Sequence, residues 1–373
     1  MNILIFSWRG PGHPHAGGAE KATHEHAKGW VKKGHNVTLF TSDYRHARRE
    51  EIIDGVRIIR SGSQIFGVHI EAFKWYLIGN HPKYDLIIDQ FHGIPFFTPL
   101  YIKEKKMAFI HEVTKEVWSL NPWPPPFNLI PSILGRLFEP LIFKLFYTKV
   151  PFMTGSDSTK KDLISLGIPE KNITVIPYGI TIPKVKPFSK EEKKTLIFLG
   201  ALSKDKGIEQ VLEIFSILNN SDTDFQFWIV GKGEDHYLKK LIIKSIKLGL
   251  KGRVKFWGFV DEKKKFKLLG GAHILVTPSA REGWGLVVIE AAAVGTPTVG
   301  YNVAGLRDSI LNGKTGILCN PNPKDCSDAI LNLIKDKEKY EIFRQNCLKR
   351  SKEFNWNISS KGSLKLIEKL VDI

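Results

Sequence analysis

Two glutamates, Glu282 and Glu290, lie in a stretch of the sequence that is otherwise almost uncharged. Glu290 falls inside the apolar segment 286–294, where a buried carboxylate is costly unless something hydrogen-bonds to it. The hydroxyl groups of a ribose could supply those bonds. Glu282 precedes Gly283 and Gly285, where backbone N–H groups at a helix start could bind phosphate. These residue types together predict a site for a sugar nucleotide.

Two glycine-containing motifs each precede a predicted helix. Gly17-Gly18-Ala19-Glu20 opens the first helix, where a backbone without side chains can approach phosphate closely. The alternative is a tight strand-to-helix turn. Gly200 begins a second loop that ends in Lys206-Gly207, and Lys206 could reach a diphosphate as a point charge. The alternative there is a solvated lysine.

Histidines raise two further possibilities. His111 follows the predicted strand 107–110 and could bond a sugar hydroxyl, the alternative being a surface histidine. A zinc site could be suspected from four histidines near the N-terminus. Residues two apart do not share a helix face, so we predict no metal site. The four are His13, His15, His24 and His26.

Short apolar strands alternate with helices along the whole chain, which favours α/β architecture with parallel sheets covered on both faces. Segment 180–194 holds Pro183, Pro187 and a run of lysines without periodicity, and we predict a linker there. The expected organisation is a doubly wound domain at 1–182, a second at 183–355 and a C-terminal helix at 356–373. Every motif above follows a predicted strand, where ligands bind in such sheets.

Composition limits the class of protein. The 373 residues are 42% hydrophobic, so a sizeable core is expected, and 55 basic against 38 acidic residues give a net charge of +17. The charge indicates either an anionic partner or simply a lysine-rich surface. Three cysteines without a Cys-x-x-Cys pair are typical of a reducing compartment, so we expect a cytoplasmic protein. The first residues predict a strand and not a signal peptide, and no apolar run is long enough to span a bilayer.

The segment 134–148 mixes apolar side chains with Arg136 and Lys144, and it follows the Pro-rich stretch 121–127. It could be an interfacial element that meets acidic lipid, or a core helix kinked by Pro140. The sequence leaves both alternatives open.

In their order along the chain, these motifs resemble the family-4 retaining glycosyltransferases of the GT-B fold, in which two Rossmann-like domains face each other across a cleft. The resemblance spans nearly the whole chain. Its most specific part is Glu282 with seven residues before Glu290. The supporting motifs are Gly17-Gly18-Ala19-Glu20, His111-Glu112, Ser156-Asp157-Ser158, Pro177-Tyr178-Gly179, Lys206-Gly207, Gly295-Thr296-Pro297 and Gly305-Leu306-Arg307-Asp308.

The resemblance implies roles for individual positions. Glu290 would hold the donor ribose, and Glu282 and His111 the transferred sugar. Lys206 would neutralise the diphosphate. The remaining donor-binding positions would be Gly18, Gly200, Arg281, Gly283, Trp284, Gly285, Leu286 and Arg307. Many relatives carry arginine where this chain has Ala201, so Arg281, Arg307 or Lys204 would have to replace that cation.

The resulting hypothesis is a retaining hexosyltransferase in cell-surface polysaccharide or glycolipid synthesis. It would use a nucleotide-sugar donor without a metal or other cofactor, and a glycan or lipid-linked acceptor that approaches over residues 12–18 and 121–127. Peripheral contact with acidic membrane, at the inner face of the plasma membrane, fits the charge, and nucleic acid is not an expected partner. The alternatives are a sugar-nucleotide epimerase or hydrolase of the same fold, and a non-catalytic anion-binding module.

Overall fold

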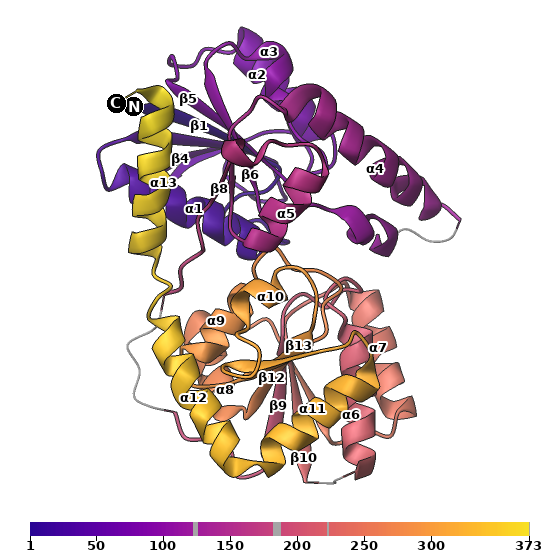
Figure 1. Cartoon of the computed structure of the whole chain (residues 1–373). Coiled ribbons are helices and arrows are strands. Elements are labelled where there is room, and N and C mark those ends of the chain that lie inside the picture. The colour runs from indigo at the N-terminus through magenta and orange to yellow at the C-terminus, as the bar shows by residue number, and fades with distance from the viewer. Residues whose placement is uncertain (122–125, 182–187, 222–223, 373) are drawn as a thin grey trace. The chain divides into compact units, whose positions relative to one another are not determined.

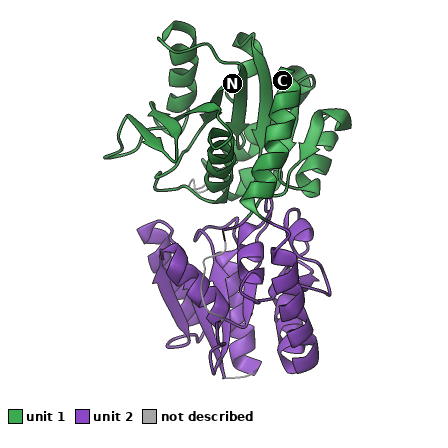
Figure 2. Cartoon of the chain, turned by 90° about the vertical axis from the view of Figure 1, so that its left-hand side faces the viewer, with its two compact units in different colours: residues 1–179, 355–373 green, residues 180–354 purple. Residues whose placement is uncertain are grey.

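The computed structural model describes residues 1–121, 126–181, 188–221 and 224–372. The chain forms two compact units, drawn in different colours in Figure 2. Unit 1 comprises Met1–Gly179 and Asn355–Ile373, and unit 2 comprises Ile180–Phe354. The predicted division between residues 182 and 183 lies outside the described residues, as does the part of the predicted linker at 182–187.

The sheet of unit 1 is parallel except at one edge. Its described strands are β1 (Asn2–Ser7), β2 (Asn36–Thr41), β3 (Glu50–Ile53), β4 (Val56–Arg60), β5 (Leu86–Phe91), β6 (Lys105–Ile110), β7 (Phe152–Thr154) and β8 (Ile173–Val175). Their order is β3-β4-β2-β1-β5-β6-β7-β8, and only β3 runs antiparallel to its neighbour. Residues 3–6 of β1 are at most 1% exposed on either side of the strand, so both faces of the sheet are covered.

The β3–β4 hairpin is an element that the sequence analysis missed. Its two-residue loop, Asp54-Gly55, has positive φ values of 51° and 83°, and the register pairs Ile53 with Val56. Asp-Gly between two apolar runs is a strong local signal for this kind of turn. The signal was therefore present in the sequence.

Helices cover the sheet of unit 1. They are α1 (Gly18–Val31), α2 (Gly67–Ile78), α3 (Thr98–Tyr101), α4 (Leu129–Ile142), α5 (Asp157–Ser165) and α13 (Trp356–Val371), with short turns η1 (Lys115–Leu120), η2 (Phe143–Tyr147) and η3 (Glu170–Asn172). Although α13 is last in the chain, it packs beside α1 (Figure 1). Ser363 Oγ lies 2.9 Å from both His26 Nδ1 and Trp30 Nε1, so a buried polar contact joins the two helices.

Segment 134–148 was predicted to be either an interfacial element or a core helix, and helix α4 covers its first nine residues. The one fully buried side chain of α4 is Glu139, whereas most of its leucine, isoleucine and phenylalanine side chains are exposed. The interpretation as a core helix is therefore wrong for residues 134–142, whereas Phe143 and Tyr147 of η2, in the same segment, are buried in a core cluster. Of the Pro-rich stretch 121–127, residues 122–125 lie outside the described residues. None of the helices in the described part of the chain has both the length and the apolarity needed to cross a bilayer.

Unit 2 contains a second parallel sheet. Its described strands are β9 (Lys194–Leu199), β10 (Phe225–Val230), β11 (Val254–Gly258), β12 (Ile274–Thr277), β13 (Thr298–Tyr301) and β14 (Gly316–Cys319), in the order β11-β10-β9-β12-β13-β14. Counted from β9, this is the order 3-2-1-4-5-6 of a doubly wound nucleotide-binding sheet. Its helices are α6 (Ile208–Ser221), α7 (Asp235–Lys247), α8 (Glu262–Gly271), α9 (Leu286–Ala292), α10 (Leu306–Ser309), α11 (Pro323–Lys335) and α12 (Lys337–Ser351).

Alternate residues along the strands of unit 2 enter different cores. Leu196 and Phe198 of β9 belong to one buried cluster, and Ile197 between them belongs to another. Because successive strand residues point to opposite faces, both faces of this sheet are buried. The prediction of two parallel α/β domains is confirmed in both units.

Candidate functional site

The topology of unit 2 locates its candidate site. Strand order reverses between β9 and β12, so the loops that follow these strands meet at the point where doubly wound sheets bind ligands. The two loops are in direct contact, because the Ala280 N–H donates to the Asp205 carbonyl at 2.8 Å. Gly207 has φ of 71°, and a Cβ there would lie 2.1 Å from the Pro278 carbonyl oxygen. Glycine is required for this approach.

An ion pair between a lysine and a glutamate lies where the two loops meet. Lys206 Nζ lies 2.9 Å from Glu282 Oε2, and Ser279 Oγ donates to Glu282 Oε1 at 2.8 Å. The side chains of Lys206 and Glu282 retain 25% and 15% exposure, so both are oriented by contacts and still reach solvent. The arrangement combines an ammonium group suited to phosphate with a carboxylate suited to hydroxyl groups.

A third loop, after β13, supports the backbone of Glu282. The Glu282 N–H donates to the Ala304 carbonyl at 3.1 Å. Gly305 has φ of 78°, and a Cβ there would lie 2.0 Å from the Glu282 carbonyl oxygen. The adjacent Trp284 is 6% exposed and packs edge-on against Phe354, with ring centroids 5.3 Å apart. Three loops thus fix the position of one glutamate.

Glu290 lies on α9 and is 5% exposed, as its apolar surroundings predict. Lys265 of α8 lies 2.8 Å from Glu290 Oε1. The sequence analysis named ribose hydroxyl groups as possible partners of this buried carboxylate, and the structure shows that a lysine of the same unit already compensates it in part. A carboxylate has about four lone-pair sites, so the contact with Lys265 leaves capacity for further donors.

The other predicted donor residues of unit 2 lie in the same three loops or beside them. Gly200 directly follows β9, and its carbonyl oxygen would lie 1.8 Å from a Cβ on Gly231. Gly285, with φ of 80°, is the residue before α9, which begins at Leu286. Arg281 is buried and directly precedes Glu282 and Gly283 in the chain, and Arg307 is exposed on α10, which follows the third loop.

In unit 1, His111 directly follows β6 and is buried. Its Nε2 lies 3.0 Å from Thr23 Oγ1, and its Nδ1 lies 2.5 Å from the Tyr178 hydroxyl. Thr23 Oγ1 donates its proton to the Ala19 carbonyl, so it must accept from His111 Nε2–H, and Tyr178 must donate to Nδ1. Burial lowers the pKa of His111 from 6.5 to about 3, so the ring is neutral. Both ring nitrogens are therefore engaged within unit 1.

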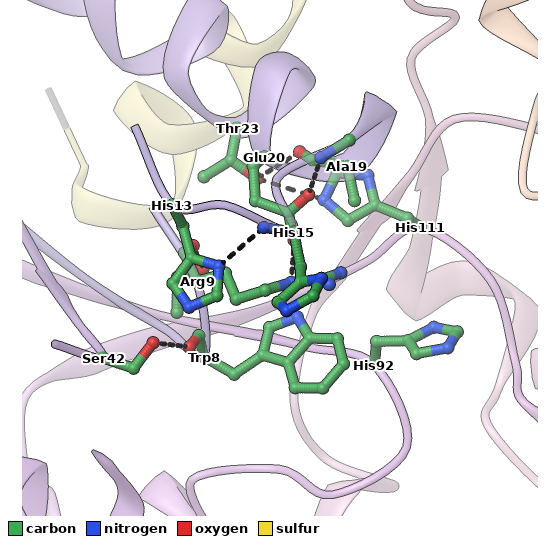
Figure 3. Close-up of polar contacts among 12 residues, drawn as sticks. Trp8, Arg9, His13, His15, Ala19, Glu20, Thr23, Ser42, His92 and His111 are labelled. Atoms are coloured by element: carbon green, nitrogen blue, oxygen red, sulfur yellow. Dashed lines mark hydrogen bonds and ion pairs between the residues drawn. The ribbon is translucent and has the colours of Figure 1, made fainter. Parts of the chain in front are cut away.

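Figure 3 shows the start of α1 beside this histidine. Glu20 accepts from the Gly17 N–H at 2.7 Å and pairs with Arg9 Nε at 2.9 Å, so it caps the helix at the exposed Gly18. The Arg9 guanidinium lies 4.2 Å from the centroid of the Trp8 ring. The glycine pair thus lies in the loop that follows β1. Strand order in this sheet reverses between β1 and β5, and ligands bind doubly wound sheets at such a reversal.

The histidines of α1 point to different partners. His24 Nε2 lies 3.0 Å from Asp54 Oδ2, and His26 is buried against Ser363. Within the described residues, no group of three or more histidine, cysteine, aspartate or glutamate side chains could hold a metal ion.

Four residues that contact the predicted site residues were not themselves predicted from the sequence. Tyr178 lies inside a motif that was singled out and Ser279 lies three residues before Glu282, although neither received a role. Lys265 belongs to the run of lysines at 263–265, in which the sequence does not distinguish the one that faces Glu290. Thr23 is separated from His111 by 88 positions, and only the fold reveals their contact.

Comparison with protein families gives two matches that together cover residues 16–350. The family described as "Glycosyltransferase Family 4" matches residues 16–182, and "Glycosyl transferases group 1" matches residues 181–350. Among curated proteins, the glycogen synthase of Mycobacterium tuberculosis is 25% identical over 370 residues, covering 86% of this chain and 83% of that protein.

Solved structures share the fold. Sucrose-phosphate synthase from Thermosynechococcus elongatus superposes with a TM-score of 0.80 at 19% identity, covering 99% of this chain and 98% of the other. The Anabaena protein HepE, solved in complex with UDP-glucose, gives a TM-score of 0.73 at 19% identity, with 99% and 100% coverage.

Proposed function

The chain belongs to the family-4 glycosyltransferases with the GT-B fold, and on that premise we propose that it is a retaining hexosyltransferase. The donor is a nucleotide-sugar, and the acceptor is a glycan or lipid-linked sugar of a surface polysaccharide or glycolipid. The reaction takes place in the cytoplasm, since the three cysteines are buried and unbridged, as is typical of a reducing compartment.

One observation carries this proposal: the contact of Lys206, Glu282 and Ser279 where the loops after β9 and β12 meet. A cation and a carboxylate in contact match the two ends of a hexose diphosphate, whose phosphates are anionic and whose ring bears hydroxyl groups. HepE, which has the same fold, was solved with UDP-glucose, and this supports a donor of the same chemical class here.

Donor recognition divides among the residues of unit 2. Lys206 exchanges part of its contact with Glu282 for the diphosphate, and Glu282 accepts hydroxyl groups of the transferred sugar. Glu290 accepts the ribose hydroxyls while it keeps Lys265 as a partner. Backbone groups of Gly200 and of residues 283–286, with Arg281 and Arg307, complete the phosphate environment, and the two arginines compensate for Ala201.

Transfer proceeds on one face of the donor sugar. The bond between the anomeric carbon and the diphosphate oxygen breaks, and the acceptor oxygen bonds to the same face of that carbon. The acceptor proton passes to the departing diphosphate oxygen. Lys206 stabilises the charge that develops there. Neither glutamate serves as nucleophile or general base, and no metal is needed.

His111 contributes from unit 1 as a neutral imidazole. We propose that it contacts the transferred sugar by exchanging Thr23 for a sugar hydroxyl at Nε2, which donates in either case. Gly18 is exposed at the start of α1, and its backbone approaches the diphosphate of the donor. The acceptor is held near residues 12–18 of the same unit.

The test is an assay of purified protein with labelled nucleotide-sugars and a panel of glycan and lipid-linked acceptors, in the presence of a chelator. We expect a product with the anomeric configuration of the donor, and a lower turnover in Glu282→Ala. Inversion of configuration, or activity abolished by the chelator, would contradict the mechanism. Turnover of donor alone to an epimer or to free sugar would favour an epimerase or hydrolase.

A further inference from the structure

Helix α4 carries its apolar residues on the outside of unit 1. Ile130, Ile133, Leu137 and Leu141 recur every three or four residues, the spacing of one helix face. These four side chains are 50%, 61%, 56% and 43% exposed. Figure 1 shows α4 running along the periphery of unit 1, away from the sheet.

The opposite face of α4 is polar or small, and this is the face that packs against the protein. Ser132 Oγ lies 3.0 Å from Ser119 Oγ of η1. A Cβ on Gly135 would lie 2.1 Å from the Trp118 ring, so that helix and ring are in close contact. Glu139 accepts from the backbone N–H groups of Thr114 and Lys115 at 2.9 and 3.0 Å, and from Trp118 Nε1 at 3.1 Å. A surface helix normally buries its apolar face, and here the arrangement is reversed.

The exposed apolar residues continue from α4 onto neighbouring elements. On α2, Ile70, Phe73 and Leu77 are 54%, 44% and 51% exposed at the same helical spacing. Phe73 packs on Tyr101 of α3 with ring centroids 4.9 Å apart, and Phe97, just before α3, packs on Phe146 of η2 at 6.1 Å. We call the following exposed apolar residues of these elements the apolar surface: Ile70, Phe73 and Leu77 of α2, Leu100 of α3, Leu145 of η2, and Ile130, Ile133, Leu137 and Leu141 of α4. These ring contacts link the elements, and exposed apolar side chains on several linked elements are unusual on a protein that has no partner there.

Basic residues accompany this surface. Arg136 of α4 and Lys144 of η2 are exposed among its apolar residues. A cavity of about 540 Å³ is lined by Phe146 and by four lysines, Lys103, Lys105, Lys106 and Lys149. Lys105 lies 3.3 Å from Asp372, and Glu104, which also lines the cavity, accepts from the Tyr76 hydroxyl at 2.5 Å. The cations still outnumber the carboxylates around the cavity.

We propose that the apolar surface binds a lipid bilayer that contains anionic headgroups, with α4 lying in the plane of the interface. The apolar side chains enter the boundary between headgroups and acyl chains, and the lysines of the cavity and Arg136 meet lipid phosphates. A second copy of the chain is a poorer occupant, because a twofold interface would bring identical cationic patches together. The proposal goes beyond glycosyl transfer and does not depend on the donor site.

The test is co-sedimentation of the full chain with vesicles of phosphatidylcholine, alone or mixed with phosphatidylglycerol, without nucleotide or acceptor. Wild type is expected to bind the mixed vesicles more tightly, and added salt is expected to weaken that binding. The triple variant Ile133→Ser, Leu137→Ser, Leu141→Ser should lose at least about tenfold in partition coefficient, since each substitution removes apolar carbons from the bilayer. Equal binding by this variant and wild type would overturn the proposal.

The matched control is a triple serine variant at Ile242, Ile243 and Ile246 of α7, which are 38%, 53% and 51% exposed on unit 2. It should bind vesicles as wild type does. If the α4 variant fails to fold, hydrogen exchange of the wild type replaces it: slower exchange of α4 amides on mixed vesicles supports the proposal. Unchanged exchange, or a dimer that buries α4 in solution without any vesicle binding, would contradict it.

Discussion

The contact between Lys206 and Glu282 matters for ligand binding through orientation and not through the energy of the ion pair. In the structure the ammonium group neutralises the carboxylate at 2.9 Å, and Ser279 holds the other carboxylate oxygen. Both side chains are partly exposed, so the energy of the pair itself is small. Its value lies in orientation, because the cation is fixed where three loops meet.

Lys206→Ala is therefore predicted to weaken binding of a nucleoside diphosphate by about ten- to a hundredfold, the range for a lost hydrogen bond to a charged group. Calorimetric titration measures this directly. Lys204→Ala is the control, since that exposed lysine lies in the same loop and the proposed function gives the replacement of the missing cation to Arg281 and Arg307 instead. Equal losses in the two variants would show that only the general charge of the loop matters.

His26 and His111 make the stability of unit 1 depend on pH. Burial lowers the pKa of each from 6.5 to about 3. Between these values the unfolded chain binds protons that the folded chain does not, so the free energy of unfolding falls as pH falls below 6.5. The expected slope is about 1.4 kcal/mol per pH unit for each histidine.

Urea unfolding at several pH values between about 7.5 and 5 measures this slope. His111→Asn should reduce it because one titrating group is gone. His15→Gln, at an exposed histidine, should leave it unchanged. A slope that is the same in wild type and His111→Asn would show that His111 is protonated in the folded chain.

At the scale of elements, glycines in the left-handed region let the loops of unit 2 approach one another. Gly305 lets the loop after β13 contact the backbone of Glu282, and Gly207 lets the loop after β9 contact Pro278. The positions of Glu282 and Lys206 thus depend on loops that are distant in sequence.

Gly305→Ala is predicted to destabilise unit 2 and to weaken donor binding, since the new Cβ would lie 2.0 Å from the Glu282 carbonyl oxygen. Gly313→Ala provides a matched control: Gly313 has φ of 73°, but a Cβ there meets nothing within 4 Å. Both variants place an alanine in the left-handed region, which costs about 1–2 kcal/mol of backbone strain. Only Gly305→Ala should also weaken the binding of a nucleoside diphosphate. Thermal unfolding with and without this nucleotide separates the effects. Equal nucleotide effects in both variants would contradict the role given to this loop.

Element prediction from sequence succeeded where periodicity was clear and failed where side-chain direction mattered. The strands of both parallel sheets are largely continuous apolar runs bounded by turn residues, and the predicted strand 107–110 lies within β6, which begins two residues earlier and ends at the same residue. Helix α4 was ambiguous, because an apolar helix face looks the same in sequence whether it turns inward or outward. Only the contacts of Ser132, Gly135 and Glu139 with η1 settle its direction.

For the whole molecule, the alternation of apolar strands and helices along the chain was sufficient to predict two doubly wound sheets, and the positions of the motifs after predicted strands indicated the edges on which the candidate residues lie. The sequence does not reveal which partner each of these residues holds. Lys265 beside Glu290, and Thr23 and Tyr178 around His111, are contacts across the fold. They depend on how helices pack on each sheet, which no local pattern encodes.

The most direct test of the central claim, a nucleotide-sugar site in unit 2, is thermal unfolding with UDP, GDP, ADP and dTDP in turn, without added metal. A ligand at a hundred times its dissociation constant adds about 2.7 kcal/mol of stability to the folded chain. We predict that one nucleotide raises the midpoint, that Glu290→Ala abolishes the rise, and that Glu338→Ala, at an exposed glutamate of α12, retains it. No rise with any nucleotide, or an equal rise in Glu290→Ala, would contradict the account.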